Sequence, residues 1–171
     1  MSAGVRAPAI APLALLSASL CQAADSPTPQ FPEGAKAFAS NCAVCHGAAG
    51  AGQPALAPPL LANPARYASA PEGRRQLALT VLYGMFGDIT VDQKHYNFKM
   101  PEFSQQSDAT LSAVLNFVVF DLAHASADTK SMEPAEIAAE RGAALDGTAV
   151  RTPCQRARRS RRRLRCARGA G

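Results

Sequence analysis

The stretch "NCAVCHG", residues 41–47, places Cys42 and Cys45 three positions apart, with His46 directly after the second cysteine. On a helical turn, residues i and i+3 project from one side, so the two thiols are expected to face the same way with the imidazole beside them. Three kinds of chemistry use such a group: zinc binding, dithiol exchange and covalent attachment of a haem. The rest of the sequence indicates which of the three applies.

Zinc and dithiol chemistry find little support elsewhere in the sequence. A zinc site needs about four ligands, and the next cysteines after Cys45 are Cys154 and Cys166, close to the C-terminus. A thioredoxin-type dithiol belongs on a βαβ scaffold, which the sequence does not predict. We therefore predict one covalent haem c, with Cys42 and Cys45 as thioether anchors and His46 as an iron ligand.

The N-terminal region predicts export. Arg6 precedes the apolar run "AIAPLALLSASL", residues 9–20, and small residues follow, in the order of a secretory signal peptide. We expect the signal peptide to span residues 1–24, followed by a linker over residues 25–32 and a periplasmic mature chain. No second long apolar run suggests a membrane span.

The C-terminal region has a different composition from the rest of the chain. Residues 151–171 contain nine arginines and no acidic residue, whereas residues 25–150 contain eight basic and thirteen acidic residues, a net charge of −5. The formal charge of +5 for the whole chain therefore reflects this segment. We predict that residues 151–171 form a basic, disordered tail. We expect no nucleic-acid partner for the protein, and membrane association only through a protein partner or through this tail. A shifted reading frame would explain the abrupt change in composition at least as well as a binding arm.

Helical patterns dominate the middle of the chain and predict an all-α fold of about four helices. The predicted helices cover about residues 33–45, 71–84, 108–124 and, more weakly, 133–145. The third carries the clearest apolar stripe, with positions spaced by three and four: Leu111, Val114, Leu115, Val118, Val119 and Leu122. Residues 47–70, rich in Gly, Pro and Ala, predict a long loop, and residues 125–150 a linker with the weak helix. So thin a core is expected to need a large apolar prosthetic group.

A sixth iron ligand is expected further along the chain, in "YNFKMPEF", residues 96–103. Met100 offers a neutral thioether that favours reduced iron, and Pro101 stiffens the loop beside it. Met85 and Met132 are alternatives, but Met85 is expected inside a helix end and Met132 lies beyond the last strong helix. His95 and His124 are the candidates for ligation by two histidines. Tyr96 and Asn97 are expected to contact a haem propionate, to orient Met100 or simply to pack the loop.

Taken together, these residues resemble the class I, monohaem cytochrome c family over about residues 33–124. The resemblance rests on Gly34 and Phe38 ahead of the Cys42–His46 motif, on a Pro-x-Leu at residues 58–60, on Met100-Pro101 and on a final helix bearing Phe117. It implies that the first and last helices cross at Gly34. It also implies that the Pro58 carbonyl fixes the orientation of His46.

Residues 87–118 resemble, less specifically, the cytochrome subunits and domains that accept electrons from periplasmic or membrane-bound dehydrogenases. The function implied is single-electron transfer rather than enzymatic catalysis. The implied partners are a dehydrogenase donor and a cytochrome or oxidase acceptor. The alternative is a haem-based peroxidase or gas sensor, which would need an open or weakly held sixth position.

Overall fold

The computed structural model describes residues 1, 28–143 and 145–151. The expected signal peptide after Met1 and the basic segment beyond Arg151 lie outside the described residues. The elements follow in the order α1 (Pro32–Asn41), α2 (Ala43–His46), α3 (Asn63–Ala68), α4 (Pro71–Tyr83), β1 (Ile89–Val91), β2 (Lys94–Tyr96), α5 (Asp108–Asn116), the π-helix η1 (Phe117–Leu122) and α6 (Pro134–Glu140). The predicted all-α fold is confirmed, with one small hairpin added.

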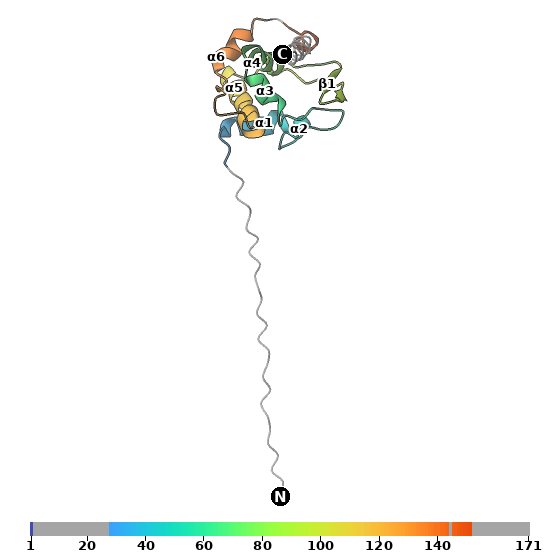
Figure 1. Ribbon diagram of the computed structural model, residues 1–171, viewed down its shortest axis with the longest axis vertical. Helices are drawn as coiled ribbons and strands as arrows, with labels where there is room; N and C mark the ends of the chain where they lie inside the picture. Colours follow the sequence, from blue (N-terminus) through green and yellow to red (C-terminus); the bar gives the residue numbers. More distant parts are fainter. Residues whose placement is uncertain (2–27, 144, 152–171) are drawn as a thin grey trace, which may run out of the picture.

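Helices α1 and α5 pack directly against each other at one end of the body (Figure 1). Gly34 makes this approach possible, since a Cβ atom there would collide with the Ala113 carbonyl of α5 and would lie only 2.8 Å from Cβ of Phe117, where η1 begins. One turn further on, the rings of Phe38 and Phe117 have their centroids 5.3 Å apart. The two helices therefore pack closely at the position where the sequence predicts their crossing.

The core consists of two clusters of buried side chains. One joins α4, α5 and α6, and the other joins α1 to α5 and η1. Five of the six residues of the predicted apolar stripe are buried, and Leu122 is half-buried. Ser107 begins α5 as its N-cap, because its Oγ accepts a hydrogen bond of 3.1 Å from the Thr110 amide.

Four local features differ from the expectations. The predicted loop over residues 47–70 contains α3, which begins with a proline in its first turn. The strands β1 and β2 pair antiparallel, and Asp92 and Gln93 turn between them with positive φ. The helix predicted over 108–124 changes to π geometry at Phe117, and the helix predicted over 33–45 is interrupted at Cys42.

The segment after η1, expected as a linker with a weak helix, packs on the domain. Met132 and Ile137 are buried in the cluster with α4 and α5. Asn116 accepts from the Met132 amide at 2.6 Å and donates to the Met132 carbonyl at 3.0 Å. Arg74 of α4 forms a two-pronged ion pair with Glu136 of α6, with N–O distances of 2.8 and 2.6 Å. Within the described residues, no helix has the length and apolar character to cross a membrane.

Candidate functional site

The Cys42–His46 motif forms a single helical turn directly after α1. Cys42 ends α1, and its carbonyl accepts hydrogen bonds from the amides of Cys45 and His46 at 3.2 and 3.0 Å. Gly47 follows with φ 75° and stops the turn. Both thiols are free and half-buried. The i, i+3 spacing on a real turn places the two sulfur atoms on one side of it, as attachment to two vinyl groups of one porphyrin requires.

His46 is buried, and its Nδ1 atom lies 3.0 Å from the carbonyl oxygen of Pro58. A carbonyl oxygen only accepts, so Nδ1 carries the proton and donates, and Nε2 keeps its lone pair free. Burial lowers the pKa of His46, while the bond to Pro58 partly opposes this shift. The imidazole is therefore held neutral and oriented, which is the form that binds iron.

The loop after His46 brings Pro58 to the imidazole. The Gly52 amide donates to the His46 carbonyl at 2.8 Å, and the Leu60 amide donates to the Gly50 carbonyl at 2.8 Å. Gly52 has φ 75°, and a Cβ atom there would lie 2.6 Å from the Ala57 oxygen and 2.8 Å from the Pro58 carbonyl carbon. Sequence reasoning missed Gly52, although a glycine within a Gly- and Pro-rich loop signals a close approach of two backbones.

The thiol chemistry argues against a redox dithiol. Burial raises the pKa of Cys42 from 9.0 to about 11, and the neighbouring Cys45 adds to the rise. Reactive dithiols have at least one thiol whose pKa is lowered by a helix terminus or a cation. The zinc alternative also lacks ligands in the described part of the chain, where no three His, Cys, Asp or Glu side chains lie together to hold a metal ion.

Met100 lies in a loop that pairs with the segment after α4. Its amide donates to the Met85 carbonyl at 2.7 Å, and the Met85 amide donates to the Met100 carbonyl at 3.2 Å. The Met100 side chain is half-buried and packs against the cluster of α4, α5 and α6. Met85 was expected inside a helix end; it lies instead two residues beyond the end of α4 and serves as the backbone partner of Met100.

The other predicted residues occupy different environments. Tyr96 is buried at the end of β2, and Asn97 is exposed in the loop that leads to Met100. Among the alternative ligands, the side chain of His95 is 74% exposed on the hairpin and His124 is exposed beyond η1. Met132 is a core residue with 2% of its surface exposed.

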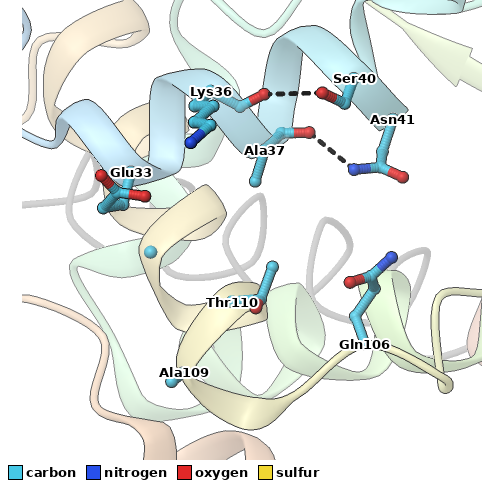
Figure 2. Close-up of a pocket in the computed structure, with 9 residues that line it drawn as sticks. Glu33, Lys36, Ala37, Ser40, Asn41, Gln106, Ala109 and Thr110 are labelled. Atoms are coloured by element: carbon cyan, nitrogen blue, oxygen red, sulfur yellow. Dashed lines mark hydrogen bonds between the residues drawn. The ribbon is translucent and has the colours of Figure 1, made fainter.

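A groove of about 410 Å³ lies between α1 and the start of α5 (Figure 2). None of the predicted site residues lines it. Two of its polar side chains turn back onto their own helix, since Ser40 donates to the Lys36 carbonyl and Asn41 donates to the Ala37 carbonyl. We assign no chemistry to this groove.

A turn that presents two thiols and an oriented neutral imidazole is the arrangement that attachment of a c-type haem requires. The family model described as cytochrome c matches residues 31–119, and the chain belongs to this family. Two proteins named cytochrome c-552, both from Thermus thermophilus, are each 41% identical to the chain over 86 residues. The aligned part is 50% of this chain but 65% and 57% of the two relatives.

Membership of the family implies one covalently bound haem c, and the residues present fit this group. The two thiols remain free of a disulfide, and His46 has its Nδ1 satisfied and its Nε2 available. The prediction of the cofactor is confirmed by the family match.

Proposed function

We propose that this chain is a periplasmic carrier of single electrons, exported through a cleaved signal peptide. The observation that carries the proposal is the hydrogen bond of 3.0 Å between His46 and Pro58, which orients the imidazole directly after the two cysteines and leaves its Nε2 free. When bound, the haem supplies the one-electron couple of its iron. The protein anchors the group through Cys42 and Cys45 and sets its potential through its ligands and burial.

We further propose that Met100 supplies the sixth ligand and thereby closes the iron to external molecules. The paired backbones of Met85 and Met100 fix the position of the loop, and Pro101 restricts its movement. A thioether ligand raises the reduction potential and suits an electron carrier. A peroxidase or a gas sensor would need this position to be open.

The electron donor that the resemblance of residues 87–118 suggests is a dehydrogenase, with another cytochrome or an oxidase as acceptor. Three large apolar side chains are exposed on the segments that carry the proposed site: Val44, Leu61 and Phe98. Apolar side chains with polar surroundings are suited to a brief contact with a redox partner. We propose that partners dock on this side of the molecule, where α2 and the β1–β2 hairpin lie (Figure 1).

The proposal is tested with holoprotein exported in a host that attaches haem c. A potentiometric titration should follow a one-electron Nernst curve. The oxidised protein should show the weak near-infrared charge-transfer band that methionine ligation gives to ferric haem, and Met100→Ala should abolish it, whereas Met132→Leu should keep it. A ferric spectrum without this band would refute the assignment of Met100.

A further inference from the structure

The residues after α6 return to the segment that pairs with Met100. Residues 145–151, here called the C-terminal strap, lie beyond the residues that the family model matches. The carbonyl of Gly147 accepts a hydrogen bond of 3.2 Å from the Phe86 amide, and Nη1 of Arg151 donates to the Asp88 carbonyl at 3.0 Å. The strap therefore holds the backbone on both sides of Gly87.

The strap is anchored to α4 as well. Val150 is fully buried, and its carbonyl accepts a bond of 3.1 Å from Nε2 of Gln76 in a buried environment. Asp146 caps the strap's own helical turn, because its side chain accepts from the Ala149 amide at 2.8 Å. These contacts fix the strap relative to α4, so it can act as a support for residues 85–88.

The contact at Gly147 leaves no free space. A Cβ atom there would lie 2.7 Å from Cε1 of Phe86 and 3.2 Å from Cα of Met85. The ammonium group of Lys99, the residue before Met100, lies 5.7 Å from the centroid of the same Phe86 ring. Phe86 thus contacts both the strap and the loop that carries Met100.

We propose that the C-terminal strap positions Met100, acting through Phe86 and through the hydrogen-bonded backbones of Met85 and Met100. The inference rests on the proposed role of Met100 as the sixth iron ligand. By holding residues 85–88 in place, the strap reduces the fraction of molecules in which the loop moves and the thioether leaves the iron. A segment outside the family's own domain then controls how firmly the sixth position is closed.

The test measures how tightly imidazole binds to the ferric holoprotein. Imidazole reaches the iron only in molecules whose methionine has left, so its apparent affinity reports the open fraction. Gly147→Ala inserts a methyl group against Phe86 and Met85 and should raise this affinity about tenfold, which corresponds to a tenfold larger open fraction. Arg151→Ala removes the bond to Asp88 and the packing of the Arg151 side chain beside Gly87 but adds no new clash, so it should raise the affinity less.

Two variants serve as controls. A Cβ atom at Gly142 would meet no atom within 4 Å, so Gly142→Ala should bind imidazole as the unmutated protein does. Ser107→Ala removes the N-cap of α5 and lowers the stability without touching the strap, and it too should leave the affinity unchanged. In amide hydrogen exchange, Gly147→Ala should speed exchange of the Met100 amide, whereas Gly142→Ala and Ser107→Ala should not.

The outcomes separate the two proposals. If the unmutated ferric protein lacks the methionine charge-transfer band, the ligand assignment fails and the role of the strap fails with it. If the band is present but Gly147→Ala and Arg151→Ala bind imidazole like the unmutated protein, only the strap proposal is overturned. An equal rise in Ser107→Ala would also overturn it, since general destabilisation would then explain the effect.

Discussion

Nδ1 of His46 and the carbonyl oxygen of Pro58 lie 3.0 Å apart, although twelve positions separate the two residues in the chain. The Cys42–His46 turn supplies the imidazole, and the Gly- and Pro-rich loop supplies the acceptor. A partner on the far nitrogen of a ligating histidine sets its orientation and raises its basicity. The loop would therefore influence the electronic properties of a bound haem through His46.

Gly52→Ala should weaken this bond. The new methyl group would lie 2.8 Å from the Pro58 carbonyl carbon, so the Pro58 segment must move away from His46. A weaker hydrogen bond makes the imidazole a poorer donor to ferric iron, and the reduction potential should rise. Gly47→Ala is the matched control: Gly47 has the same φ of 75°, but a Cβ atom there would meet only the Ala51 nitrogen, at 3.9 Å. Redox titration should show a larger shift for Gly52→Ala than for Gly47→Ala; equal shifts would contradict the role of Pro58.

Asn116→Ala should cost substantial stability. The Asn116 amide satisfies both the N–H and the C=O of Met132 in the buried core. Its removal leaves two buried backbone groups without these partners, a cost of about 2–4 kcal/mol in the free energy of unfolding. Denaturant titration of the reduced holoprotein measures it, with Ser107→Ala, expected to cost about 1 kcal/mol, as a comparison. A cost no larger than that of Ser107→Ala would show that water replaces the lost bonds.

Glu136→Gln should change the dependence of stability on acid. The hydrogen bonds from Arg74 lower the pKa of Glu136 below its ordinary value of 4.5. Because the folded-state pKa is the lower one, this stabilisation is present above pH 4.5 and is lost as the pH falls toward the folded-state pKa. The effect is small, since the carboxylate is partly exposed and salt screens it. The difference in unfolding midpoint between the unmutated protein and Glu136→Gln should be smaller at pH 3 than at pH 7. An equal difference at the two pH values would exclude a contribution from this ion pair.

Two truncations test which C-terminal residues the haem site needs. A chain that stops after Arg151 should keep its haem spectrum and reduction potential, because residues 152–171 have no apolar periodicity that predicts packing. A chain that stops after residue 145 loses the buried Val150 and the bonds to Phe86 and Asp88, and it should bind imidazole more tightly in the ferric state. Loss of the haem spectrum in the longer truncation would contradict the prediction that the basic tail is dispensable.

The sequence predicted the parts of the fold that depend on regular patterns. The stripe from Leu111 to Val119 is a helical pattern, and α4 begins at the proline and ends before the glycine that signal its limits. The hairpin escaped prediction because each strand has only three residues and Asp92-Gln93 lacks the glycine that usually marks such a turn. The change from α to π geometry at Phe117 has no sequence signal, since α5 and η1 bury one continuous apolar stripe.

The candidate site, too, could be predicted only in part from the sequence. The spacing of Cys42, Cys45 and His46 predicts the haem-attachment site from the sequence alone, because the chemistry depends on one local turn. The supporting contacts depend on tertiary structure: Gly52 on the approach of the Pro58 segment, Met85 on a bridge to Met100, and Gly147 on the return of the strap. None of these pairings leaves a periodic pattern in the sequence.

Binding of carbon monoxide by the reduced holoprotein at neutral pH tests the electron-carrier proposal most directly. If Met100 closes the sixth position, the unmutated protein should keep its reduced spectrum under carbon monoxide, whereas Met100→Ala should convert to the carbon monoxide complex and have a lower reduction potential. Ready conversion of the unmutated protein would contradict the proposal and would favour a gas sensor or a peroxidase with an open sixth position.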